Sequence, residues 1–335
     1  MSMASKRSLL LVMIGIFVLG IGIDAFVRWT AGPSLPRVVV VQDKPQEWAD
    51  ALKLGLHDGL KQRGVVEGQD AIVIERSAAG DPQGLTGLAE AVALERDVAV
   101  VYTLGTQATQ AVFRAVGNSG KNIVFGAVTD PVAAGLYNGL LDKPIGNITG
   151  TQDLWPYPAQ FDLILELLPK AKKVGIVYNA SEVNSQVSVT LIQNETKKRG
   201  LELIQRTVTE ESQISAAVAG LIAAGIDVFF IPADNTAQTS AQVIINACMQ
   251  KSIPVFTGIP GIVQSGALAT VGTNYYELGK VNAEQIALIL KGTPASKIPP
   301  RIADKGDLYI NLSSAKQLGV TIPDELRKRA FQIYQ

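Results

Sequence analysis

The sequence predicts an α/β protein with parallel sheets, organised as two lobes across one cleft. From about residue 36, short β-rich runs alternate with longer helical patterns, which is the sequence form of parallel βαβ units. The segment Asn147–Pro158 interrupts this alternation, which then starts again. Polar clusters directly follow apolar runs, as in Ile231–Thr236, where a buried strand should end. We therefore expect two Rossmann-like lobes joined by a hinge that the chain crosses several times.

The first half contains four short apolar runs that predict strands, separated by helical patterns. The strands are expected at Arg37–Val41, Ala71–Glu75, Val98–Leu104 and Ile123–Val128, and the helices at Trp48–Arg63, Gly84–Arg96 and Thr106–Val116. Asn147–Pro158 is rich in Gly, Thr, Pro and aromatic residues, so it is expected to be a crossing between the lobes.

The second half repeats the alternation with different residues. Its strands are expected at Val174–Tyr178, Leu201–Arg206, Val228–Ile231, Pro254–Thr257 and Ala267–Val271. Its helices are expected at Pro158–Leu168, Ser185–Gly200, Ile214–Ala224, Gln238–Lys251 and Tyr276–Lys291. We expect 1–35 to be a signal or anchor and linker, 36–150 with 276–308 the first lobe, and 151–275 with 309–335 the second. Return crossings are expected near Thr270–Tyr276 and Leu308–Asn311.

The composition argues against several functional classes. With 47% apolar residues, a formal net charge of zero and scattered Lys and Arg, the chain is globular and lacks the basic face that nucleic acid requires. The single cysteine, Cys248, is expected to be buried, and His57 is the only histidine, so no metal site is expected. No cofactor is expected either. Without a plausible proton shuttle or a Gly-x-Ser-x-Gly turn, we do not expect an enzyme.

The N-terminus predicts export. Lys6 and Arg7 precede the apolar run Leu9–Ile23, which is the layout of a secretory signal or signal anchor. No small-x-small pair stands cleanly after the run, and residues 9–29 are just long enough to cross a bilayer of about 30 Å. We favour an anchor in the inner membrane over a cleaved signal, and we place the remaining chain in the periplasm or on the outer surface.

Several short motifs occur in a fixed order, and the ordered set is more specific than any one of them. They are Thr103–Thr106, Val128–Pro131, Gly146–Gly150, Asn179–Ser185, Pro232–Thr236, Ile253–Phe256, Gly266–Ala269, Asn274–Gly279 and Asn311–Gly319. With this set the chain resembles the ABC transporter substrate-binding protein family, in particular its tryptophan- and tyrosine-binding members, over about Val38 to Ala330. The resemblance implies a type I periplasmic binding-protein fold. It also implies a receptor that passes an amino-acid-like ligand to a membrane permease with a cytoplasmic ATPase.

A second function remains open, namely the ligand-sensing ectodomain of a membrane signalling system. Two lobes that close on a ligand beside a retained anchor suit either role. A neighbouring gene for a multi-span permease and an ATPase would favour the transporter, whereas a kinase or cyclase gene would favour the sensor.

Two predicted helix starts are candidates for binding a ligand carboxylate. A buried zwitterion needs a partner for each charge, and free amides at a helix N-terminus suit the carboxylate. Thr106 and Gln107 begin one helix after a strand, and Asn184 and Ser185 begin another in the facing lobe. The alternative for each pair is an ordinary helix cap.

The ligand ammonium needs a carboxylate. Asp234, followed by Asn235 and Thr236, is the best placed by sequence, and its alternative role is the N-cap of the next helix. Thr129 and Asp130 follow another strand and suit either the cleft or a turn.

The first crossing contributes further candidates. After Gly150 the sequence departs from the family pattern with Thr151–Pro158, which includes Asp153 and Trp155. Four aromatic residues are candidates for an apolar wall against a flat ligand, with packing at the lobe junction as the alternative: Trp155, Tyr157, Tyr178 and Tyr275.

Overall fold

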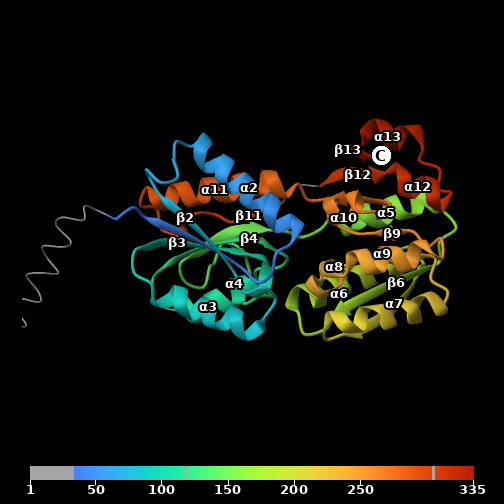
Figure 1. The fold of residues 1–335 in the computed structure, drawn as a ribbon, viewed down its shortest axis with the longest axis horizontal. Coiled ribbons are helices and arrows are strands. Elements are labelled where there is room, and N and C mark those ends of the chain that lie inside the picture. The colour runs from blue at the N-terminus through green and yellow to red at the C-terminus, as the bar shows by residue number, and fades with distance from the viewer. Residues whose placement is uncertain (1–33, 118, 304–305) are drawn as a thin grey trace, which may run out of the picture.

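The computed structural model describes residues 34–117, 119–303 and 306–335. They form two α/β lobes that lie side by side, as Figure 1 shows. The predicted signal or anchor at residues 9–29 lies outside the described residues. Among the residues that are described, no helix has both the length and the apolar character needed to cross a membrane.

The first lobe is built on a six-stranded parallel sheet with the order β11-β5-β4-β3-β1-β2. Its strands are β1 (Arg37–Gln42), β2 (Ile72–Ser77), β3 (Val98–Leu104), β4 (Asn122–Val128), β5 (Ile148–Gln152) and β11 (Arg301–Ile302). Its helices are α2 (Glu47–Gln62), α3 (Pro82–Leu94), α4 (Gly105–Val116), α11 (Tyr275–Leu290) and the short 3₁₀ turn η2 (Ala295–Lys297).

The second lobe is built on a seven-stranded sheet with the order β13-β12-β10-β9-β8-β6-β7. Its strands are β6 (Lys173–Asn179), β7 (Glu202–Val208), β8 (Val228–Phe230), β9 (Val255–Phe256), β10 (Ala269–Gly272), β12 (Asp307–Asn311) and β13 (Gln332–Tyr334). Its helices are α5 (Tyr157–Leu167), α6 (Val183–Lys198), η1 (Glu211–Gln213), α7 (Ile214–Ala223), α8 (Asn235–Thr239), α9 (Ala241–Met249), α10 (Pro260–Gln264), α12 (Leu312–Leu318) and α13 (Asp324–Arg329).

The two-lobed α/β fold predicted from the sequence is confirmed, with three corrections. The second sheet is not wholly parallel, because β10 and β12 pair antiparallel. Ile148–Gln152 is a fully buried strand rather than part of an irregular crossing, since Gly150 takes φ +156° and lets β5 pack against Phe125 in β4. The helix predicted over Gln238–Lys251 is divided into α8 and α9 at Ser240.

Among the described strands, consecutive elements change from one sheet to the other at three points. The passages follow β5, β10 and β11. The third lies just ahead of the expected Leu308–Asn311, since those residues form part of β12 itself. Three passages at one junction are expected to favour an opening and closing motion of the lobes.

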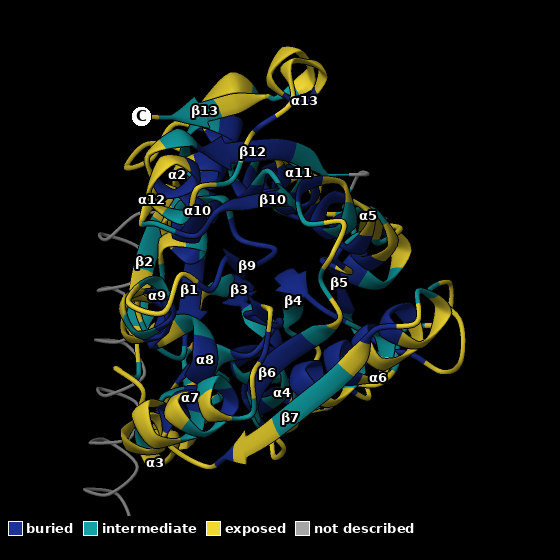
Figure 2. Cartoon of the chain, turned by 90° about the vertical axis from the view of Figure 1, so that its right-hand side faces the viewer, coloured by how far each residue is buried: buried dark blue, intermediate teal, exposed yellow. Residues whose placement is uncertain are grey.

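The central strands of each lobe are buried between helices whose outer faces are exposed, whereas an edge strand such as β7 is partly exposed, as Figure 2 shows for the second lobe. Cys248 is fully buried in α9, as expected. In the first lobe, α2 and α11 pack so closely that a Cβ on Gly55 would overlap the backbone carbonyl of Tyr276. This contact fixes the start of α2, which carries Trp48, beside the start of α11, which carries Tyr275.

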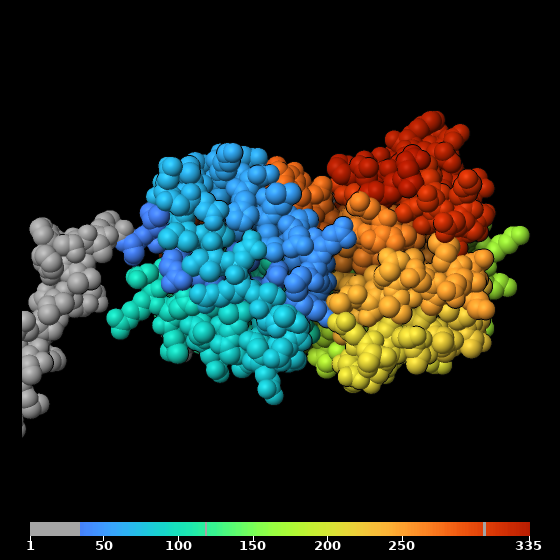
Figure 3. Space-filling view, in the orientation of Figure 1, coloured from blue at the N-terminus to red at the C-terminus, as the bar shows by residue number. Residues whose placement is uncertain are grey.

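The lobes touch along their junction. In Figure 3 the blue atoms of the N-terminal part of the first lobe meet the orange atoms of the second. One ion pair spans this seam, from Lys44 Nζ to Glu211 Oε1 at 2.6 Å. The described conformation is therefore one in which the cleft is narrow.

Candidate ligand-binding site

A pocket lies between the lobes at the carboxyl ends of their strands. It encloses about 340 Å³ of space free of protein atoms, part of it open to solvent. Its lining residues come from both lobes and from the hinge: Trp48, Gly105, Thr106, Ala127, Thr129, Asp153, Trp155, Asn184, Ala233, Asn235, Gln238 and Tyr275. Most of them closely follow β1, β3, β4, β6 or β8, which is where open α/β sheets bind ligands.

The first-lobe wall includes the N-terminus of α4. This helix begins at Gly105 directly after β3, and Gly105 has φ +80°, a conformation that favours glycine. A Cβ there would lie 3.1 Å from the Trp48 ring, so the residue also leaves room for the indole. The first amides of a helix have no intrahelical partner, and an anion beside Gly105 and Thr106 would satisfy them.

Asp153 is the charged side chain among the described residues that line the pocket. It lies in the passage after β5 and is 5% exposed. Its Oδ1 accepts a hydrogen bond from Thr273 Oγ1 (2.6 Å), and its Oδ2 accepts from Tyr275 OH (2.8 Å) and Trp155 Nε1 (3.3 Å). Burial raises the pKa of this carboxyl, and the three neutral donors oppose that shift. A cation in the pocket would favour the ionised form.

Two aromatic side chains, Trp155 and Tyr275, contact this carboxylate, and a third, Trp48, packs against Tyr275. Trp48 and Tyr275 have ring centroids 5.8 Å apart, and Trp155 Nε1 also donates to Tyr275 OH at 3.2 Å. Burial and the neighbouring Asp153 raise the pKa of Tyr275 well above its ordinary value, so its phenol stays protonated and can donate to Asp153. The rings form an apolar wall in which Trp155 Nε1 and Tyr275 OH point toward the carboxylate, whereas Trp48 Nε1 donates to Gln46 Oε1.

The second-lobe wall is polar. Asn184, in the first turn of α6, donates through Nδ2 to Ala233 O (2.9 Å) and Glu182 Oε2 (3.1 Å). Its Oδ1 is buried and has no hydrogen-bond partner among the described residues. A buried acceptor without a partner is costly, and a ligand donor would satisfy it.

Asp234 does not line the pocket. Its Oδ1 accepts from Ala237 N (2.6 Å) as the N-cap of α8, and its Oδ2 accepts from Asn179 N and Ser185 Oγ, both at 2.6 Å. It is fully buried. Burial and the charge of Glu182 raise its pKa to about 6. Both oxygens are thus committed within the second lobe, and Asp153 is the carboxylate that the structure places at the pocket.

The remaining sequence candidates divide into two groups. Thr106, Thr129, Trp155, Asn184, Asn235 and Tyr275 line the pocket together with Asp153. Gln107, Asp130, Tyr178, Ser185 and Thr236 do not. Asp130 accepts from Val132 N and Ala133 N in a turn. Tyr178 packs against the second-lobe core, and Thr236 donates to Glu182 Oε1.

The sequence reasoning missed Trp48, Gly105, Ala127, Ala233 and Gln238. Trp48 is visible in the sequence only as the start of a helix, yet it follows β1, one of the predicted strands from which no candidate was taken. The other candidates were chosen because residues that follow a parallel strand line the cleft, and the same reasoning applied to β1 finds Trp48.

The chain is similar to known proteins over most of its length. Residues 38–334 match the family described as ABC transporter substrate binding protein. A tyrosine-binding protein of Clostridioides difficile is 32% identical over 270 residues, which cover 80% of this chain and 76% of that protein.

Two solved structures are informative as a pair. One is a domain from Streptococcus pneumonia in complex with L-Trp, at 27% identity and a TM-score of 0.84. The other is the ligand-free, open structure of a substrate-binding protein from Clostridium difficile, at 28% identity and a TM-score of 0.69. Each comparison covers 90% of this chain and 100% of the other. At nearly equal identity, this chain is closer in overall shape to the ligand-bound relative. From the family match over most of its length, the chain belongs to the ABC transporter substrate-binding protein family.

Proposed function

We propose that the protein binds a free α-amino acid between its lobes and delivers it to the permease of an ABC importer outside the cytoplasm. The observation that carries this proposal is Asp153, a buried carboxylate at the pocket whose three hydrogen-bond donors are all neutral. An ammonium group would supply the missing positive charge. The N-terminus of α4 would receive the ligand carboxylate across the pocket.

The aromatic wall favours a ligand with a flat side chain. Trp48, Trp155 and Tyr275 offer ring faces and edges, and stacked or edge-on rings add about 0.5–1.5 kcal/mol beyond area burial. The free Oδ1 of Asn184 adds one acceptor for a ligand N–H or O–H. The names of the relatives, which refer to tyrosine and L-Trp, support the same class.

A thermal-shift screen of the free amino acids, with purines and small peptides as comparison, tests the proposal. A ligand at 100 times its Kd stabilises the folded protein by about 2.7 kcal/mol, which is readily detected. The N-acetyl and carboxamide derivatives of the best ligand serve as matched controls, since each removes one charge of the zwitterion. Both should bind much more weakly. A screen with no stabilising amino acid, or derivatives that bind as well as the parent, would contradict the proposal.

Delivery requires a separate measurement. Transport of the bound amino acid into vesicles that contain the partner permease and ATPase should depend on this protein. The sequence predicts a signal or anchor at residues 9–29. We propose that this segment places the lobes on the outer side of the membrane.

A further inference from the structure

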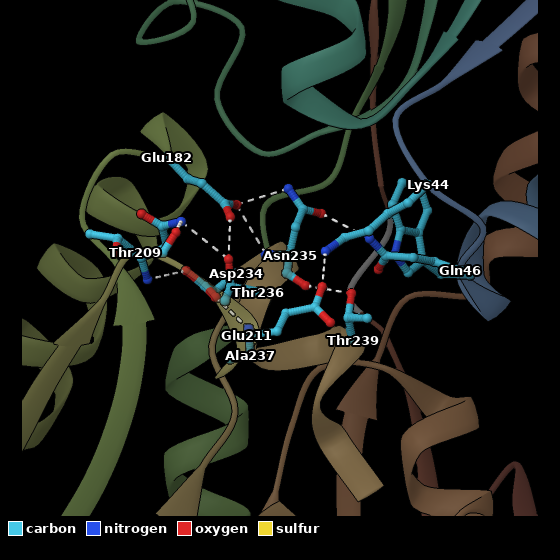
Figure 4. Close-up of polar contacts among 12 residues, drawn as sticks. Lys44, Gln46, Glu182, Thr209, Glu211, Asp234, Asn235, Thr236, Ala237 and Thr239 are labelled. Atoms are coloured by element: carbon cyan, nitrogen blue, oxygen red, sulfur yellow. Dashed lines mark hydrogen bonds and ion pairs between the residues drawn. The ribbon is translucent and has the colours of Figure 1, made fainter. Parts of the chain in front are cut away.

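One amide side chain contacts both lobes at the edge of the pocket. Gln46 precedes α2, and its side chain makes no capping hydrogen bond. Its Oε1 accepts from Trp48 Nε1 at 2.6 Å, and its Nε2 donates to Asn235 Oδ1 at 3.2 Å. Figure 4 shows Gln46 reaching from the first lobe toward Asn235. Trp48 and Asn235 both line the pocket, whereas Gln46 does not.

The second-lobe end of this bridge is held by a buried carboxylate. Glu182 is 3% exposed, and its Oε2 accepts from the backbone N (3.0 Å) and the Nδ2 (2.8 Å) of Asn235. The same oxygen accepts from Asn184 Nδ2. These bonds fix the Asn235 amide with its nitrogen toward Glu182 and its oxygen toward Gln46. Asn235 therefore presents an acceptor at a defined position when the lobes close.

The first-lobe end is the indole of Trp48. Its ring is confined by Gly105 on one side and Tyr275 on another. The Gln46–Trp48 bond is made within the first lobe, whereas the Gln46–Asn235 bond joins the lobes. The orientation of the indole is thus linked, through one side chain, to closure.

We propose that Gln46 is a positioning residue for the ligand pocket: its amide holds the Trp48 indole and locks it against Asn235 on closure. This inference rests on the proposed amino-acid binding. Glutamine suits the role because it offers an acceptor to the indole N–H and a donor to the Asn235 oxygen at once. Neither methionine nor glutamate can do both.

The Lys44–Glu211 ion pair provides a matched control. It also joins the lobes and starts two residues before Gln46, but neither of its residues lines the pocket. Removing it should weaken closure without releasing the indole. Comparing Lys44→Met with Gln46→Met therefore separates a mere closing contact from a positioning role.

The experiment uses the full-length chain in detergent, labelled with 5-fluorotryptophan, and L-tyrosine as the titrant. The chain has three tryptophans, and Trp48→Phe identifies the ¹⁹F resonance of Trp48. Stopped-flow mixing gives kon and koff. For Gln46→Met we expect a koff about two- to tenfold faster, the effect of one lost neutral hydrogen bond, with kon nearly unchanged. The ligand-bound Trp48 resonance should leave its wild-type position.

Two control variants separate the loss of a contact between the lobes from the loss of the bond to the indole. Lys44→Met should speed release while the Trp48 resonance stays in place. Gln46→Glu keeps an acceptor for the indole but loses the donor to Asn235, so release should be faster with a wild-type Trp48 resonance in the free protein. Wild-type koff and resonance in Gln46→Met would overturn the inference, as would a Gln46→Met that behaves like Lys44→Met.

Failure of the proposed function would look different. If L-tyrosine leaves the wild-type spectrum and thermal stability unchanged, tyrosine binding fails. The ligand-free Trp48 resonances of wild type and Gln46→Met then decide the present inference. Coincident resonances would overturn it, and a displaced resonance in the variant would support it.

Discussion

Asp153 Oδ1 accepts a 2.6 Å hydrogen bond from Thr273 Oγ1, and this contact joins two of the three passages between the lobes. Asp153 follows β5, and Thr273 lies between β10 and α11. The carboxylate at the ligand pocket is thus held by hinge residues and by Tyr275 at the start of α11. A change in hinge angle would move the hydrogen-bond donors of Asp153. The charge of a ligand and the closure of the lobes would therefore both affect this carboxylate.

Replacing this carboxylate should abolish tight binding. Asp153→Asn keeps the size of the side chain but removes its charge, leaving the ligand ammonium unpaired in a buried site. We expect a loss of about 2–5 kcal/mol of binding free energy, measured by calorimetry with the best ligand from the screen. Asp130→Asn is the matched control, since an Asn oxygen can still accept from Val132 N and Ala133 N. Equal affinities for Asp153→Asn and wild type would rule out this pairing.

Binding should also depend on pH through Asp153. Burial raises the pKa of its carboxyl in the free protein, and a bound ammonium favours the ionised form. At pH values below that raised pKa the group must lose a proton to bind, so affinity should fall as the solution becomes more acidic and level off above it. Calorimetry in two buffers of different ionisation enthalpy would detect the released proton. Asp153→Asn should remove this dependence, and a pH-independent wild type would argue against it.

Several candidates chosen because they follow a predicted strand do lie at the pocket, since that choice depends on topology alone. Buried parallel strands bring their carboxyl ends to one edge, whatever side chains come next. Thr106, Thr129 and Asn184 were found in this way, and all three line the pocket. That choice does not say which way a side chain turns after the strand.

Asp234 illustrates that limit. It follows β8 at the same edge as the pocket, so its sequence position suits a ligand contact and a helix cap equally well. Its direction is decided by α8, which starts at the next residue, and by Asn179 and Ser185 from another strand–helix unit. The β5 strand was missed for a related reason. Its glycine and threonines are weak signals locally, and its burial between β4 and β11 is set by distant segments.

The buried Asp234 should make the free energy of unfolding depend on pH. Its pKa is raised to about 6 in the folded protein by burial and Glu182, against 3.8 as the ordinary value. Between these values the folded state holds the proton more tightly than the unfolded chain does. Proton binding at Asp234 therefore stabilises the folded state. This stabilisation is fully present below the pKa of the unfolded chain and is lost as the pH rises through the pKa of the folded protein. At 1.36 kcal/mol per unit the whole shift corresponds to about 3 kcal/mol, of which about 2 kcal/mol is lost between pH 4 and pH 7.

Urea unfolding of wild type and Asp234→Asn across this range isolates the effect. The free energy of unfolding of wild type, measured relative to that of Asp234→Asn, should decrease as the pH rises. Other carboxyls, such as Glu95 beside Arg76, change both proteins alike and cancel in the difference. A constant difference would show that the donors Asn179 N, Ser185 Oγ and Ala237 N fully offset burial.

The position of Trp155 should depend on Gly258, a glycine of the second lobe that follows β9. A Cβ on Gly258 would overlap the Trp155 indole, so Gly258→Ala must displace the ring and weaken its bonds to Asp153 and Tyr275. We expect about 1–3 kcal/mol lower stability, typical of overpacking, together with weaker ligand binding. Gly87→Ala in α3 is the matched control, because its Cβ meets open space and should stabilise the helix by about 0.5–1 kcal/mol without affecting affinity. If Gly258→Ala binds the ligand as tightly as wild type, the Trp155 indole is not part of the binding wall, because displacing a ring that contacts the ligand should lower the affinity.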